Sequence, residues 1–456
     1  MLCFLIAMYK FILAIRYLLR RRIAYFAVLA VALCVFIVVV VMTVMVGLVG
    51  DFKRKNHDSV GDCVVATGSL VGFPYYEDFV TLLKNADCVY AVSPVIKSYA
   101  LLSPQDDDID IGVEVLGIDP VSHDRAAAFG KTLTYRADDV SKAFQPMYDV
   151  NLPGCILGID LALRRDARSR YLYEPKPPRV ALSITCFPLT ASGALAKADT
   201  GLVNTQIFYY SDNSRTGLAR VDGSIVYLPF QQAQLLCGMA GETKRVNALY
   251  IKFKPAVKLE AGCAEIFALW QQFKHQRAAE KYVNLLDAVT VQSWKSYRRE
   301  AIAPMEKEQT IVSIMFVFVG ITTVFIVLVV FYMIVSHKSK DIGILKSAGA
   351  SNVSVVQLFA GFAFMVGLLG SCVGVVTGWL FLLKINWIEN WLFERFGFQL
   401  WDRRIYAIGD IPSHVDLAVL TTIVCSAVAA CLVGALIPTL QAARLNPADS
   451  LRVSQL

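Results

Sequence analysis

Histidine and cysteine are the residues of this chain that could hold a metal or carry redox chemistry. The five histidines are scattered and match neither an H-E-x-x-H motif nor a zinc-ligand spacing: His57, His123, His275, His337 and His414. Six of the eleven cysteines lie between residues 51 and 309, with no C-x-x-C pair among them: Cys63, Cys88, Cys155, Cys186, Cys237 and Cys263. Disulfides and buried thiols both fit this even number, so no pairing is predicted, and no metal site is expected.

Sequence motifs for catalysis are absent from the chain. It contains no G-x-x-x-x-G-K-[ST] phosphate loop, no G-x-S-x-G elbow, and no kinase or dinucleotide-binding fingerprint. The net charge of +7 is not gathered into a basic, aromatic-rich stripe, which argues against nucleic-acid binding. We therefore expect a non-enzymatic protein that binds no cofactor of its own.

Four long uncharged stretches set the architecture, at residues 23–50, 310–336, 358–383 and 417–437. A helix rises about 1.5 Å per residue, so even the shortest stretch crosses a hydrocarbon core of roughly 30 Å. The first stretch is too long for the core of a signal peptide and has no clear cleavage site after it, so we expect it to be retained. The chain is predicted to be a membrane protein with four transmembrane α-helices.

Basic residues predict the orientation of these helices, because short basic segments stay on the cytoplasmic side. Residues 1–22 carry five basic side chains and no acidic one: Lys10, Arg16, Arg20, Arg21 and Arg22. The apolar residues of this segment recur at helical spacing, which predicts an amphipathic helix at the membrane surface. Residues 337–357 and 438–456 are also basic. Both termini are therefore predicted to be cytoplasmic, with residues 51–309 and 384–416 outside.

The long polar insert, residues 51–309, has the pattern of an α+β domain. Strands are predicted at residues 113–117, 224–228 and 249–254, and helices at 74–86 and 264–286. A charged helix at residues 294–307 is expected to lead into the second span, with Pro304 as the point where it could kink.

Small residues on the third span predict close helix packing. Gly370, Gly374 and Gly378 recur four residues apart, and Gly367 extends the set. The fourth span offers small residues as complements, so we predict tight packing of the third span on the fourth. No span contains a charged residue, which leaves no visible carrier for a proton or ion relay.

Two motifs resemble the FtsX-like permease superfamily. Residues 337–351 read HKSKDIGILKSAGAS and are similar to its D-I-[AG]-I-L-[RK]-x-x-G-A-S loop, and residues 438–452 read PTLQAARLNPADSLR and match its P-x-x-x-A-A-R-L-x-P-x-x-x-L-R ending. Between the third and fourth spans, Tyr406 to Pro412 resembles the Y-x-x-x-x-I-P of lipoprotein-releasing permeases of the LolC and LolE type. That resemblance covers most of the chain in order and implies a MacB-like periplasmic core for the insert.

The resemblance implies one permease half of an ABC transporter. It would pair with a second copy or a paralogue and with a cytoplasmic ABC ATPase on separate chains, where ATP and Mg are used. The complex would take an acylated lipoprotein from the membrane lipid of the outer leaflet of the bacterial inner membrane, and hand it to a periplasmic chaperone. The alternatives are a MacB-like efflux permease and an FtsX-like regulator of a cell-wall hydrolase.

The same resemblance assigns residues to an ATPase-coupling loop. Lysines would supply charge, apolar residues would supply contact, and a glycine would make the turn: Lys338, Lys340, Asp341, Ile342, Ile344, Leu345, Lys346, Gly349 and Ala350. A basic loop that only obeys the positive-inside rule is the plainer interpretation of the lysines. His337 stands where the family usually has Glu, so a docking salt bridge from a carboxylate at that position is not expected.

Overall fold

The computed structural model describes residues 22–105, 109–166, 170–195, 203–337, 339–398, 401 and 410–444. The chain divides into two compact units. Asp51–Pro304 make up most of one, which we call the inserted unit. Met1–Gly50, Met305–Trp401 and Asp410–Leu456 make up the other, which we call the four-helix unit. The amphipathic helix predicted for residues 1–22 lies outside the described residues except for Arg22, and so does the tail after Arg444.

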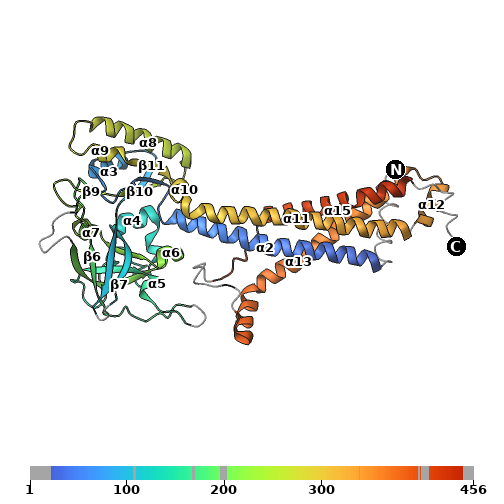
Figure 1. The fold of residues 1–456 in the computed structure, drawn as a ribbon, viewed down its shortest axis with the longest axis horizontal. Coiled ribbons are helices and arrows are strands. Elements are labelled where there is room, and N and C mark those ends of the chain that lie inside the picture. Colours follow the sequence, from blue (N-terminus) through green and yellow to red (C-terminus); the bar gives the residue numbers. More distant parts are fainter. Residues whose placement is uncertain are drawn as a thin grey trace. The chain divides into compact units, whose positions relative to one another are not determined.

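Four long helices contribute to the four-helix unit: α2 (Arg22–Asp58), α11 (Arg299–His337), α13 (Asn352–Phe396) and α15 (Leu417–Arg444). Figure 1 shows them, together with the short α12 (Ser339–Ser347). Within the described part of the chain, these four are the helices long and apolar enough to cross a membrane, as the uncharged stretches predict. Both α2 and α11 continue past the bounds of the apolar stretches into the inserted unit.

Helix α13 corrects the prediction of an external loop from residue 384. It continues without a break to Phe396, where Gly397 ends it with a φ of 67°. Glu389, on this extension, is 4% exposed. The apolar stretch ends before the helix does, because charges interrupt a hydrophobic run without interrupting backbone hydrogen bonding.

A mixed sheet forms the inserted unit, with nine strands among the described residues, in the order β11-β1-β10-β3-β4-β8-β5-β7-β6. The strands are β1 (Cys63–Thr67), β3 (Val89–Pro104), β4 (Ile111–Ile118), β5 (Gly154–Gly158), β6 (Ala181–Cys186), β7 (Asn204–Ser214), β8 (Ile225–Pro229), β10 (Ala248–Phe253) and β11 (Val289–Ser293). Strand β4 runs parallel to β8 and β5 runs parallel to β7, whereas the other pairs are antiparallel. A small second sheet joins β2 (Phe73–Pro74) to β9 (Arg245–Val246).

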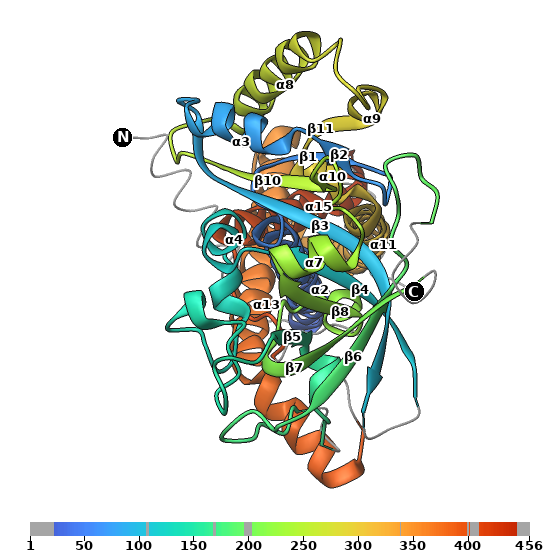
Figure 2. The same ribbon diagram turned by 90° about the vertical axis from the view of Figure 1, so that its left-hand side faces the viewer.

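Helices cover both faces of the main sheet. They are α3 (Tyr76–Lys84), α4 (Pro120–Ala127), α5 (Ile159–Ala162), α6 (Ala219–Asp222), α7 (Phe230–Leu236), α8 (Leu259–Gln276), α9 (Asn284–Asp287) and α10 (Trp294–Tyr297), with 3-10 turns η1 (Phe129–Thr132) and η2 (Val140–Lys142). Figure 2 shows α3 and α8 beside the β1, β10 and β11 end of the sheet, and α7 beside β4 and β8. Together these three helices cover one core, and α4 and α10 cover the core on the other face.

Alternation along the strands explains these two cores. In β1, Cys63 and Val65 face the core beneath α8, whereas Val64 and Ala66 face the core beneath α4. Successive strand side chains point to opposite faces, so a strand covered on both sides is apolar at nearly every position. The three predicted strands lie within or at the edges of β4, β8 and β10, and the predicted helix at residues 74–86 contains α3.

Two helix predictions in the insert need correction. The helix expected at residues 264–286 begins earlier and ends at Gln276, because the next residues have no continuous apolar face and Tyr282 has a φ of 65°. The helix expected at residues 294–307 divides at Arg298, and α11 then continues through Pro304. Trp294 is buried in the core of the sheet, which holds the short α10 apart from α11.

Candidate functional site

Helix α12 carries the segment that the sequence predicts to couple the chain to an ATPase. It ends in a glycine turn in which the Ala350 N–H donates to the Leu345 carbonyl at 3.0 Å. Gly349 has a φ of 96°, a conformation that L side chains rarely adopt. The sequence thus makes a short helix with a sharp stop, and Gly349 makes the turn that the resemblance assigns to it.

Contacts inside the four-helix unit hold α12 in place. Ile342 is 2% exposed and packs in a cluster with Val335, Phe359 and Ala442. The Lys346 ammonium donates to the Ala443 carbonyl at 2.8 Å, near the end of α15, where helix carbonyls lack partners within the helix. Two residues of the predicted coupling segment therefore contact other helices of this chain.

The remaining residues of the segment are more accessible. Ile344 is 57% exposed and Lys340 is exposed, whereas Asp341, Leu345 and Ala350 are half-buried. Lys338 lies outside the described residues. The exposed side of α12 thus presents Ile344 and Lys340. Of the three apolar residues predicted to contact the ATPase, Ile344 and Leu345 remain accessible and Ile342 does not. The sequence gives no signal that Ile342 is buried, because its partners lie on three distant helices.

Helix α13 packs on α15 as predicted, but most of its glycine stripe packs on α2. A methyl group added at Gly374 would lie 2.6 Å from the Ala32 carbonyl oxygen, and one at Gly370 would lie 2.8 Å from the Val31 side chain. Gly378 meets Val39 in the same way, whereas Gly367 faces Val428 and Cys431 of α15. A stripe of small residues shows which face of a helix has a close neighbour, but not which helix that neighbour is.

An apolar cavity of about 440 Å³ lies between α2, α11 and α15. Its lining combines aliphatic and aromatic side chains with a few hydroxyls, among them Val38, Met42, Phe316, Thr323 and Ile423. No charged residue lines it. A cavity of this character accepts hydrocarbon in preference to a polar ligand.

Known proteins are similar in sequence to this chain. Residues 313–447 match the FtsX-like permease C-terminal family. The chain is 23% identical to the lipoprotein-releasing system transmembrane protein LolC of Neisseria meningitidis serogroup B. The aligned region has 432 residues and covers 93% of each chain. The chain is thus similar to LolC-type permeases along most of its length. Its similarity to LolE of Haemophilus influenzae is 25% identity over 161 residues, 35% of this chain and 39% of that one.

A solved structure also resembles the chain at low similarity. The periplasmic region of MacB from Actinobacillus actinomycetemcomitans matches 55% of this chain and 97% of its own, with 12% identity and a TM-score of 0.31.

The loop motif before α15 is anchored in the four-helix unit. The Asn386 side chain accepts from the Ile411 N–H at 2.9 Å, and Ile411 is 4% exposed. Pro412 lies so close to α2 that a methyl group on Gly47 would be 2.6 Å from its Cβ. The Ile-Pro pair of the motif thus holds this end of the loop against α13 and α2. The other residues of the motif, except Asp410, lie outside the described residues.

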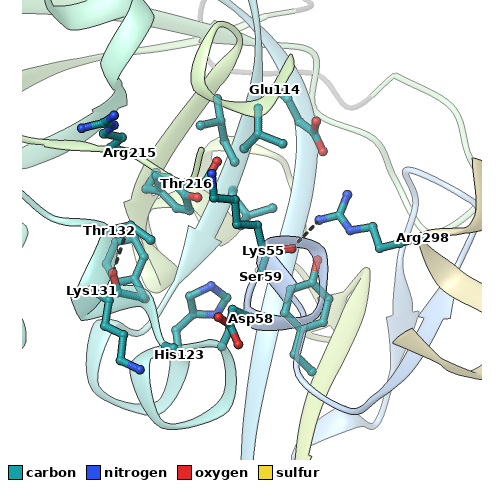
Figure 3. Close-up of a pocket in the computed structure, with 18 of the residues that line it drawn as sticks. Lys55, Asp58, Ser59, Glu114, His123, Lys131, Thr132, Arg215, Thr216 and Arg298 are labelled. Atoms are coloured by element: carbon teal, nitrogen blue, oxygen red, sulfur yellow. Dashed lines mark hydrogen bonds between the residues drawn. The ribbon is translucent and has the colours of Figure 1, made fainter. Parts of the chain in front are cut away.

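The inserted unit of the permease contains a second cavity, of about 180 Å³, whose charged lining residues are mostly basic (Figure 3). Five basic and two acidic side chains line it: Lys55, Lys97, Lys131, Arg215 and Arg298, with Asp58 and Glu114. The Lys97 ammonium donates to the Tyr297 hydroxyl at 2.6 Å, and Arg298 donates to the Ser59 hydroxyl at 3.3 Å. The excess of positive charge suits the cavity to an anionic group.

Two buried side chains, Asp222 and His123, lie beside the walls of this cavity. The Asp222 carboxylate accepts from the Thr216 N–H at 2.8 Å and from the Gly217 N–H at 2.9 Å, which fixes the loop beside Arg215. His123 is a buried residue of α4, and its Nδ1 is 3.1 Å from the hydroxyl of Ser93 on β3 of the sheet. Complete burial lowers the pKa of His123 to about 3, against a smaller raising effect of Asp119 and together with a lowering effect of Lys97.

Acid is therefore expected to destabilise the permease through His123. The unfolded chain binds a proton here near pH 6.5 and the folded chain only near pH 3, so stability falls as the pH drops between these values. By pH 5 the loss is about 2 kcal/mol of unfolding free energy. Thermal unfolding of the full chain in detergent at pH 7 and pH 5 measures it, with His123→Asn expected to show a smaller decrease.

His275→Asn is the matched control, because His275 is exposed near the end of α8. It should leave the difference between pH 7 and pH 5 as it is in the wild type. An equal decrease in the wild type and in His123→Asn would remove His123 as the cause.

Proposed function

We propose that this chain is the permease subunit of an ATP-driven complex that extracts acylated lipoproteins from the outer leaflet of the bacterial inner membrane and passes them to a periplasmic chaperone. The observation that carries the proposal is its relation to LolC, a lipoprotein-releasing system transmembrane protein, along 93% of both chains. The FtsX-like permease match over residues 313–447 supports it independently of the insert.

In this proposal the inserted unit and residues 384–416 lie outside, and both termini are cytoplasmic. The basic residues before α2 and in the α11–α13 connection support this orientation. Helix α12 then lies on the cytoplasmic side, where a separate ABC ATPase would dock on the exposed Ile344. A second permease copy or a paralogue would complete the complex.

The apolar cavity gives the proposed substrate a place to bind. It lies between the first two spans, α2 and α11, and α15, and its uncharged lining suits an acyl chain. Removing acyl chains from a bilayer costs about 0.8 kcal/mol for each buried CH₂ group, so release of a well-anchored lipoprotein requires an energy source. ATP hydrolysis by the partner subunit would supply that energy, and the permease itself carries no catalytic role.

Depletion of the protein in its source bacterium tests this function. We expect acylated outer-membrane lipoproteins to accumulate in the inner membrane when the two membranes are separated by fractionation. Re-expression of the wild-type chain should restore their sorting.

Unchanged lipoprotein sorting after confirmed depletion, in cells without a second such permease, would contradict the proposal. Loss of resistance to exported small molecules would then favour a MacB-like efflux permease. A defect in cell-wall cleavage would favour an FtsX-like regulator.

A further inference from the structure

Four of the six cysteines in the inserted unit lie in two pairs. Cys63 and Cys263 are side-chain neighbours, and so are Cys186 and Cys237, and all four are free thiols in the structure. All four belong to the core that α3, α7 and α8 cover or pack against it. The sequence did not show these pairs, because the partners are 200 and 51 residues apart.

The first pair joins the sheet to the helix that covers it. Cys63 begins β1, faces the α8 side of the sheet and is completely buried. Cys263 lies in the first half of α8 and is half-buried against the same core. Its neighbour Gly262 fits against the ring of Phe253, where a methyl group would lie 2.6 Å from a ring carbon. This close approach fixes α8 over the β1 and β10 strands.

The second pair lies where β6 ends and α7 ends. Cys186 is the last residue of β6 and Cys237 directly follows α7, with 0% and 2% of their surfaces exposed. Asn204, the strand partner of Cys186, donates from its side chain to the Leu236 carbonyl at 3.1 Å. The Leu189 N–H donates to the Cys237 carbonyl at 3.3 Å. Hydrogen bonds on both sides therefore hold the two backbones together.

The other two cysteines of the unit have different surroundings. Cys88 has the Glu265 carboxyl as its side-chain partner, and Cys155 is completely buried beside the backbone of its own strand. They provide internal controls within the same domain.

We propose that the inserted unit contains two disulfide bonds, Cys63–Cys263 and Cys186–Cys237. This inference rests on the proposed function to the extent that the function places the unit outside the cytoplasm, where disulfides form and persist. The fold brings each pair together, because Cys63 and Cys263 share one core and hydrogen bonds join the backbones next to Cys186 and Cys237. Cys88 and Cys155 remain thiols.

Each bond forms by thiol–disulfide exchange with a protein disulfide oxidant. One thiolate of the pair attacks a sulfur of the oxidant and releases one oxidant thiolate, leaving a mixed disulfide. The second cysteine of the pair then attacks the first and releases the other oxidant thiolate. The chain loses two protons and two electrons for each bond, and the oxidant becomes a dithiol.

Cys263 is the natural attacking residue of the first pair. Cys263 is the less buried of the two, so an oxidant reaches its thiol first. Both members of the second pair are buried, so an oxidant must reach them before α7 closes over the sheet. The Cys186–Cys237 bond is thus expected to form during folding, whereas the Cys63–Cys263 bond can also form afterwards.

Differential alkylation of the full chain in native membranes tests the two bonds. Acid first stops thiol exchange in the membranes. The protein is then denatured in the presence of N-ethylmaleimide, which blocks free thiols. Reduction and treatment with iodoacetamide follow, so iodoacetamide labels the cysteines that were in disulfides. Peptide mass spectrometry should find iodoacetamide on Cys63, Cys186, Cys237 and Cys263, and N-ethylmaleimide on Cys88 and Cys155. An unreduced digest should contain peptides that link 63 to 263 and 186 to 237.

Single variants provide matched controls. Cys263→Ser should transfer Cys63 to the N-ethylmaleimide fraction and leave Cys186 and Cys237 unchanged. Cys155→Ser should change the labelling of none of the four. Because the wild-type measurement alone decides the pairing, a variant that fails to fold does not prevent the test.

N-ethylmaleimide on all four cysteines, or a linkage between the two pairs, would overturn the inference. Protease added to intact spheroplasts then separates this failure from that of the proposed function. Reduced cysteines in a unit that the protease cleaves would overturn only the disulfides. A unit that the protease cannot reach would also contradict the external placement in the proposed function.

Discussion

An Ile344→Asp permease is expected to insert into the membrane normally and to lose most of its ATP-driven lipoprotein release. Ile344 is the large apolar side chain that α12 exposes, and an apolar anchor at the centre of an interface is often worth about 2 kcal/mol, or roughly thirtyfold in affinity. A buried aspartate would add a desolvation cost. Co-purification of the cognate ATPase and release from proteoliposomes measure the two effects.

Val353→Asp is the matched control. Val353 is 64% exposed at the start of α13, so the substitution has the same chemistry at a similar exposure but outside α12. It should retain ATPase binding and release. Equal loss in both variants, or full release by Ile344→Asp, would contradict docking at Ile344. Lys346→Glu is a poorer test of docking, because it would also break the contact of Lys346 with the Ala443 carbonyl.

A Gly374→Ala permease is expected to be less stable by about 1–3 kcal/mol, the usual effect of overpacking. Its methyl group would lie 2.6 Å from the Ala32 carbonyl oxygen and 2.7 Å from the Val35 Cβ, so α2 and α13 would have to separate. This effect must exceed the gain of up to about 1 kcal/mol that alanine brings to a helix. Thermal unfolding of the purified permease in detergent measures the net change.

Gly361→Ala, in the same helix, isolates the packing effect. Nothing lies within 4 Å of a methyl group at Gly361, so this variant should be as stable as the wild type or slightly more stable. A Gly374→Ala protein that unfolds at the same temperature as Gly361→Ala would show that α2 and α13 do not pack closely at this point.

The sequence predicted where the helices and strands lie better than it predicted which of them pack or pair with each other. Uncharged stretches located four helices that are long and apolar enough to span a membrane, and period-two patterns located β4, β8 and β10. Local patterns could not show that β3 pairs with β10 and β6, because those pairings join residues far apart in the chain. The glycine stripe on α13 likewise predicted a close neighbour, but the neighbour is mainly α2.

The same limit applies to the candidate site. The motif of residues 337–351 located the segment of α12 and its glycine turn, since both depend on local sequence. It did not distinguish the buried Ile342 from the exposed Ile344, because burial there depends on α11, α13 and α15. The cysteine pairs were hidden for the same reason. Side chains that meet between a sheet and the helices that cover it leave no spacing in the sequence.

The first and last strands of the inserted unit are neighbours in its sheet. Strand β1 pairs with β11, with Cys63 opposite Ser293, so the chain begins and completes the unit at the same place. Domains whose ends lie side by side tolerate insertion into other chains and exchange between them. The unit can thus be exchanged as one segment of the chain. A related permease could acquire a new external specificity by replacing this one segment while its membrane helices kept their sequence.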